Sequence, residues 1–241
     1  MFKRNRYAIL IVHGFAGGTY DEEDIANYLE LNKNFDVYQF TLPGHAKNLS
    51  KVGHEEWIMY SEEKLKWLIH NGYSKIYLLG HSLGGVIATY LATKYREVKK
   101  LVLAAPAFQY LDILGEESSV KNSIKLAPAI IRTYGGGELF SRFLKLNISA
   151  TREFTALIRE YYDYPKKLKC PVLIIQGKSD DIVPITSSMY VYNNAKSKIK
   201  KLVLVGDLTH DVFRSKKNEA IFDIVKEFLV KDKKTGGVSE I

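Results

Sequence analysis

The sequence predicts an α/β fold, built around a mostly parallel sheet of about six strands with helices on both sides. Strand-like runs recur along the chain with helical stretches between them. Several of these runs are continuously apolar and rich in branched residues, which is typical of parallel strands covered on both faces. Such alternation implies strands joined by right-handed helical crossovers. A chain of 241 residues is long enough for one large domain of this class or for two small ones.

The strands and helices can be placed in order along the chain. The predicted strands are Tyr7–Val12, Phe35–Phe40, Lys75–Leu79, Lys100–Ala104, Val172–Gln176 and Lys201–Val205. A first helix is expected after Thr19-Tyr20-Asp21-Glu22, which resembles a capping box with acidic residues near the positive end of a helix. The segment His54–His70 carries one apolar face and ends at Asn71-Gly72. Further helices are predicted over Gly85–Tyr95, near Pro184 and around Ile221–Phe228.

The stretch between Pro106 and Pro165 interrupts this alternation. It has no clear strand, and glycines and a proline divide it into three or four helical fragments. About sixty residues are too many for a simple crossover or a structureless loop. We therefore predict a helical cap over residues 106–165, inserted into a core formed by residues 1–105 and 166–230. Residues 231–241 are expected to be a polar, frayed tail.

Composition argues against several classes of protein. The net charge of +8 is compatible with nucleic-acid binding, but the basic residues are scattered, without a basic helix or an arginine-rich run. We therefore expect no nucleic-acid partner. No apolar run reaches the length of a membrane span, so no stable membrane insertion is expected. The single cysteine, Cys170, excludes an intrachain disulfide, and a soluble cytoplasmic protein is the simplest interpretation.

The most informative motif is Gly80-His81-Ser82-Leu83-Gly84, which lies between a predicted strand and a predicted helix. A Gly-x-Ser-x-Gly sequence at such a junction forms a sharp turn, the nucleophile elbow, which presents a serine hydroxyl beyond the end of a sheet. Larger residues at Gly80 or Gly84 would clash where the strand and the helix cross closely. Ser82 is therefore the candidate nucleophile.

A serine nucleophile needs a base to accept its proton and a carboxylate to orient that base. In open α/β sheets such groups lie on loops beyond the carboxyl ends of strands. Asp180 follows the fifth predicted strand and His210 follows the sixth. The order Ser82, Asp180, His210 is the one expected for one class of serine hydrolases. Asp181 remains an alternative for the acid, although the distance from the strand end favours Asp180.

With these motifs, the sequence resembles the α/β-hydrolases, and its layout is similar to that of small bacterial carboxylesterases, monoacylglycerol lipases and cinnamoyl esterases. The resemblance runs from Tyr7 to about Val230 and rests on His13-Gly14-Phe15, Leu42-Pro43-Gly44-His45, Gly80-His81-Ser82-Leu83-Gly84-Gly85, Gly177-x-x-Asp180-x-x-Val183-Pro184 and His210. It implies an oxyanion hole made by the backbone N–H groups of Phe15 and Leu83. The family's histidine usually follows a glycine, whereas Thr209 precedes His210 here.

The predicted function is that of a serine carboxylesterase acting on small to medium acyl esters. Ser82 would attack the ester carbonyl, His210 would take and return the proton, and Asp180 would orient His210. The same machinery serves thioesters and amides. An amidase or aminopeptidase therefore remains an alternative, since a charged substrate terminus could be held by an acidic residue of the cap: Glu138, Glu153 or Glu160. A ligand receptor on a hydrolase scaffold is a further alternative.

The remaining histidines have structural interpretations. His81 is expected to pack within the elbow, His13 to brace the oxyanion loop, His45 to lie in a turn and His54 to lie at a helix end. None of the six histidines lies in an H-x-x-x-H arrangement. The sequence therefore predicts neither a metal nor a cofactor.

Overall fold

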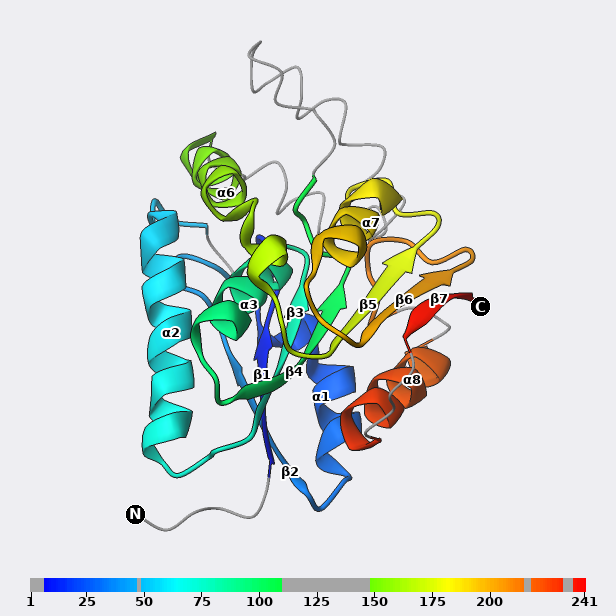
Figure 1. Cartoon of the computed structure of the whole chain (residues 1–241). Coiled ribbons are helices and arrows are strands. Elements are labelled where there is room, and N and C mark those ends of the chain that lie inside the picture. Colours follow the sequence, from blue (N-terminus) through cyan, green and yellow to red (C-terminus); the bar gives the residue numbers. More distant parts are fainter. Residues whose placement is uncertain (1–6, 47–48, 110–147, 215–217, 232–235) are drawn as a thin grey trace.

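The computed structural model describes residues 7–46, 49–109, 148–214, 218–231 and 236–241, and these residues form a seven-stranded sheet with flanking helices (Figure 1). The strand order is β2-β1-β3-β4-β5-β6-β7, and every neighbouring pair is parallel. The strands are β1 Tyr7–Val12, β2 Phe35–Phe40, β3 Ile76–His81, β4 Val98–Ala104, β5 Val172–Gly177, β6 Lys200–Val205 and β7 Gly237–Glu240. Because all strands are parallel, the loops that follow them meet at one edge of the sheet.

Helices cover both faces of this sheet. The α-helices are α1 Glu23–Glu30, α2 His54–His70, α3 Leu83–Lys94, α6 Ile148–Tyr161, α7 Ile185–Asn194 and α8 Asn218–Val230. Two short 3₁₀ helices are η1 Thr19–Asp21 and η2 Tyr164–Lys167. Among the described residues, no helix combines the length and the apolar character needed to cross a bilayer.

The core has two layers, one on each side of the sheet. Ile9 and Ile11 of β1 belong to the layer that also contains Leu29 of α1 and Val225 of α8. Alternate residues of the same strand face the other layer, where Leu10 joins the buried side chains of α2, α3 and α7. This alternation explains why the strands read as continuous apolar runs, because both faces of each strand are buried.

The first six strands and the helix His54–His70 confirm the sequence prediction, with strand boundaries that differ by two residues at most. The seventh strand, β7, corrects the expectation of a frayed tail. Gly237–Glu240 pairs with Lys201–Leu204 of β6. Backbone hydrogen bonds rather than apolar side chains hold this edge strand, and its Val238 is exposed. The sequence of β7 therefore contains no buried apolar run from which a strand could be predicted.

The capping box predicted at Thr19 is also corrected. Gly18 caps η1, and its backbone N–H donates to the Asp21 carboxylate at 3.1 Å. The α-helix begins only at Glu23, so Glu22 lies at the junction between the two helices. The side chain of Glu22 is fully buried rather than solvent-exposed at a helix end.

The predicted cap is described only in part. Helix α6 lies within its predicted range, between β4 and β5 in the chain, whereas residues 110–147 lie outside the described residues. Phe154 and Leu157 of α6 are buried in the same core layer as α2 and α3. The last helix of the predicted insertion therefore packs onto the core, and the division of the chain into core and cap stays a prediction.

Candidate active site

Ser82 lies in the sharp turn between β3 and α3. Its backbone has φ 52° and ψ −115°, a conformation that costs roughly 1–3 kcal/mol for a residue other than glycine. Three backbone hydrogen bonds hold this strained residue: its N–H donates to Ala104, and its carbonyl accepts from Gly85 and Ala107 at 3.0 and 3.1 Å. The predicted elbow geometry is therefore confirmed.

The glycines of the motif are required by close backbone contacts. A Cβ atom on Gly80 would lie 2.4 Å from the carbonyl oxygen of Gly84. A Cβ atom on Gly84 would lie 2.0 Å from the carbonyl oxygen of Val12 in β1. Any larger residue would force the strand and the helix apart. These glycines thus allow α3 to begin directly against the ends of β1 and β3.

The structure brings Asp180 and His210 together from the loops that follow β5 and β6. Asp180 Oδ2 lies 2.9 Å from His210 Nδ1, and neither side chain is more than 4% exposed. The loops touch at Gly177, where a Cβ atom would lie 2.1 Å from the carbonyl oxygen of Leu208. Of the two adjacent aspartates, Asp180 is the one that bonds His210.

The Asp180 carboxylate is held by further donors. Its Oδ1 accepts the backbone N–H groups of Ile182 and Val183 at 2.9 and 2.8 Å, and its Oδ2 also accepts from the Gln176 side chain. Burial alone would raise the pKa of Asp180, but the charge and hydrogen bond of His210 and these backbone bonds outweigh it, so the pKa is lowered. Asp180 is therefore a fixed anion beside the imidazole.

Phe15 and Leu83, the residues expected to form an oxyanion hole, lie on the two chain segments next to Ser82. A Cβ atom on Gly14 would lie 3.3 Å from Cβ of Ser82, so the loop after β1 touches the serine directly. Leu83 is the first residue of α3, and the N–H groups of a first helical turn have no acceptor within their own helix. The Phe15 ring stacks on Phe154 of α6, with centroids 4.9 Å apart.

His13 supports the loop that carries Phe15. Its Nε2 accepts the backbone N–H of Leu42 at 2.9 Å, so its Nδ1 carries the proton donated to the Gly14 carbonyl at 2.7 Å. Burial and the neighbouring His45 lower the pKa of His13 to about 3, so the ring stays neutral. This geometry agrees with the predicted bracing role.

His81 and Glu22 form a buried pair that the sequence prediction missed. His81 Nδ1 lies 2.9 Å from Glu22 Oε1, and His81 Nε2 lies 3.0 Å from the backbone carbonyl oxygen of His210. The rings of His81 and His210 are 5.0 Å apart. Because Ser82 directly follows His81, this contact places the serine and the His210 loop at the same edge of the sheet. The two partners lie 59 positions apart, and no spacing rule links them.

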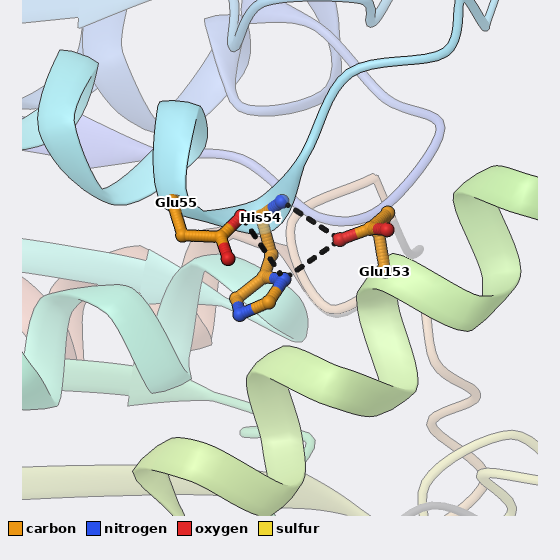
Figure 2. Close-up of side chains that lie close together, drawn as sticks. All are labelled: His54, Glu55 and Glu153. Carbon is orange, nitrogen blue, oxygen red and sulfur yellow. Dashed lines mark hydrogen bonds and ion pairs between the residues drawn. The ribbon is translucent and has the colours of Figure 1, made fainter.

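A second histidine cluster joins α2 to α6. Figure 2 shows His54 at the start of α2 between Glu55 and Glu153, with Glu153 projecting from the neighbouring helix. His54 Nδ1 lies 2.7 Å from Glu153, and Nε2 lies 3.1 Å from Glu160. Burial alone would lower the pKa of His54, but the hydrogen bonds that its ring donates to these carboxylates outweigh burial and raise the pKa. His54 thus bridges the two helices through both of its ring nitrogens.

The same cluster offers the donor atoms that a divalent cation would use. Within the described ranges, His54, Glu55 and Glu153 are the group whose ligating atoms all lie within 4.8 Å of one another. As arranged, both ring nitrogens of His54 face carboxylates and act as hydrogen-bond donors, which leaves neither lone pair for a metal. The cluster is therefore an ion-paired contact between α2 and α6.

Comparisons with known proteins agree with this fold. The carboxylesterase of Bacillus subtilis (strain 168) is 24% identical over 240 residues, which is 95% of each chain. The monoacylglycerol lipase of Mycolicibacterium smegmatis is 22% identical over 93% of this chain and 88% of that protein. The crystal structure of the Paleococcus ferrophilus monoacylglycerol lipase is similar with a TM-score of 0.72, at 22% identity and 95% coverage of both chains.

The family assignment follows from a match over most of the chain. Residues 3–217 match the family described as serine aminopeptidase, S33, a range that includes the elbow serine and the loops of Asp180 and His210. The family's description names a peptidase, whereas the relatives above are named as a carboxylesterase and a lipase. The chain therefore belongs to the serine aminopeptidase S33 family of the α/β-hydrolase superfamily and is a serine hydrolase of that fold.

Proposed function

We propose that this protein is a carboxylesterase that cleaves small to medium acyl esters through an acyl-enzyme on Ser82. The proposal rests on two observations at the same edge of the sheet: the strained backbone of Ser82 and the buried hydrogen bond between Asp180 and His210, which His81 links through the His210 carbonyl. A serine hydroxyl becomes a nucleophile only when a neighbouring base accepts its proton. The names of the aligned relatives support ester chemistry over other uses of the fold.

Each residue has a defined role in the proposed reaction. His210 takes the Ser82 proton as Oγ attacks the ester carbonyl, and it then gives that proton to the departing alcohol. Asp180 holds Nδ1–H, so that Nε2 is the basic nitrogen, and it stabilises the imidazolium that forms. The N–H groups of Phe15 and Leu83 would stabilise the oxyanion, at roughly 3 kcal/mol for each donor. Water, activated by His210, then releases the carboxylic acid.

The test is turnover of a p-nitrophenyl ester series from acetate to octanoate. We expect the wild-type protein to hydrolyse part of this series, with a burst of p-nitrophenol for those esters whose acyl-enzyme forms faster than it is hydrolysed. The Ser82→Ala variant should lose this activity while keeping the circular-dichroism spectrum of the wild type. Undiminished turnover by Ser82→Ala would refute the assignment of Ser82. The absence of turnover with every acyl donor, together with tight ligand binding, would favour a receptor.

An amidase or aminopeptidase is the second candidate because of the family's description. Such an enzyme needs an acidic anchor for a charged substrate terminus. Two of the three anchors considered, Glu153 and Glu160, bond His54, while Glu138 lies outside the described residues. These contacts favour the esterase. A matched pair of substrates, an aminoacyl naphthylamide and the ester of the same acyl group, separates the two: we expect faster cleavage of the ester, and faster cleavage of the amide would reverse the proposal.

A further inference from the structure

The buried pair Glu22–His81 joins the nucleophile turn to the loop that carries His210. Glu22 is 0% exposed and His81 is 6% exposed. Within the described residues, the second carboxylate oxygen of Glu22 is buried without a hydrogen-bond partner, so the charge of Glu22 depends on His81. A buried carboxylate without a partner is unfavourable by several kcal/mol. Burying both charged groups of such a pair is unfavourable for stability, which suggests that the pair has a specific structural or functional role.

The two contacts of His81 fix where its protons lie. The carbonyl oxygen of His210 can only accept, so His81 Nε2 must carry a proton to bond it at 3.0 Å. A second proton lies between Nδ1 and Glu22 Oε1 at 2.9 Å. Burial alone would lower the pKa of His81, but its bond to Glu22 outweighs burial and raises the pKa to about 9. The pair therefore keeps the Nε2–H donor at neutral pH while remaining neutral as a whole.

This donor acts on the backbone of His210, not on its ring. A hydrogen bond to the carbonyl of His210 restricts the loop Gly206–Arg214 from inside the protein, at the residue whose ring must face Ser82. Asp180 restricts the ring from the other side, through Nδ1. Three other charged groups lie near the pair. Asp21 and Asp211 act to raise the pKa of Glu22, and Arg214 acts to lower the pKa of Asp211. Through this hydrogen bond, His81, which directly precedes Ser82, holds the loop that carries His210.

We propose that Glu22 and His81 are positioning residues for the reaction, which hold the backbone of His210 in register with Ser82. The inference rests on the proposed function, because it assigns Glu22 and His81 a role in presenting the base to the nucleophile. The hydrogen bonds of His81 run to Glu22 and to the backbone of His210, so the proposed effect of the pair is on the geometry of the base. Small displacements of a catalytic group reduce turnover about 100-fold.

The first test separates positioning from stability. In the double variant Glu22→Leu/His81→Phe, apolar side chains of similar size replace the whole pair, and such replacements are often neutral for stability. We expect kcat for p-nitrophenyl esters to fall about 10- to 100-fold, with KM within about twofold of wild type. Glu22→Gln can still donate an amide proton to Nδ1 and leave Nε2–H in place, so it should retain most of kcat.

The matched control is Glu62→Gln, another nearly buried glutamate, which bonds Tyr95 and Lys94 away from the site. It should leave kcat unchanged. A folded double variant with wild-type kcat would overturn the proposal, as would an equal loss of kcat in Glu62→Gln.

The second test does not depend on turnover. The proton between Asp180 and His210 should give a low-field NMR resonance in the wild type and in Glu22→Gln, and this resonance should weaken or disappear in the double variant. If the wild type hydrolyses no ester, the proposed function fails, yet this resonance still reports whether Glu22 and His81 hold His210. An unchanged resonance in the folded double variant would refute the positioning role by itself.

Discussion

The Asp180 carboxylate accepts hydrogen bonds from two backbone N–H groups, from the side-chain amide of Gln176 and from His210. In Asp180→Asn, the amide would present a donor or a neutral acceptor to Nδ1, and the imidazole would no longer be held in the reactive tautomer. We expect kcat to fall by about 10⁴, the loss found for the corresponding change in a serine protease. Steady-state kinetics at pH 7 check this, and a loss of less than tenfold would argue that Asp180 is not the orienting acid.

The lowered pKa of Asp180 also gives stability a pH dependence. A carboxyl group whose pKa is lower in the folded state contributes stability above its unfolded pKa of about 3.9, and loses it as pH falls through the folded value. Asp180→Asn should therefore be less stable than the wild type at pH 7, and the difference should shrink below about pH 4. Urea unfolding at both pH values measures it. A difference that does not change with pH would contradict this account.

At the level of residues, the sequence predicted the groups marked by spacing and missed those marked only by tertiary contact. Ser82 is enclosed by glycines that the close crossing requires, and Asp180 and His210 follow strand ends. Glu22 looked like a helix-end charge, because three acidic neighbours surround it in the sequence. Its burial depends on where α1 meets the elbow, and no local pattern encodes that meeting.

At the level of elements, the elbow depends on how closely β1, β3 and α3 approach. Gly84→Ala would place a methyl group 2.0 Å from a backbone oxygen of β1, which cannot move without distorting the sheet. We expect a loss of more than about 3 kcal/mol in the free energy of unfolding, or no folded protein. The control is Gly206→Ala, whose new methyl group would meet its first neighbour at 3.7 Å. Equal stability of the two variants in urea unfolding would contradict the close crossing.

The contact between α2 and α6 predicts a second pH dependence. His54 has a raised pKa, so its bonds to Glu153 and Glu160 stabilise the fold fully below the unfolded pKa of about 6.5, and are lost as pH rises through the folded value. Because Glu160 is half exposed, we expect only about 1 kcal/mol. His54→Asn should be less stable than the wild type at pH 5.5, and the difference in stability should be smaller at pH 9. Thermal unfolding at both pH values measures this, and a gap that widens with pH would refute it.

Elements with buried apolar runs were predicted well, because burial on both faces leaves a continuous signal in β1, β3 and β5. The edge strand β7 left no such signal. Gly236 is needed there since a Cβ atom would lie 2.3 Å from the carbonyl oxygen of Lys200, and Gly237 has a φ of +142°. Backbone requirements of this kind are visible only once the partner strand is in place.

For the molecule as a whole, β7 covers the edge of the sheet that β6 would otherwise expose. An uncovered edge offers unpaired N–H and carbonyl groups to other chains. A chain ending at residue 235 should therefore self-associate and unfold at a lower urea concentration than the full chain. Size-exclusion chromatography with light scattering checks the first point. Glu240→Gln, which removes only the surface ion pair with Lys178, serves as the control. A truncated chain with the size and stability of the full one would show that β7 is dispensable.

In the proposed reaction, distant parts of the chain converge to make Ser82 reactive. The most direct measurement is the rate and position of labelling by a fluorophosphonate, followed by mass spectrometry of the digested protein. We predict one adduct on Ser82, formed rapidly in the wild type, at least about 100-fold more slowly in His210→Ala, and not at all in Ser82→Ala. Labelling of a residue other than Ser82, or an undiminished rate in His210→Ala, would contradict the account.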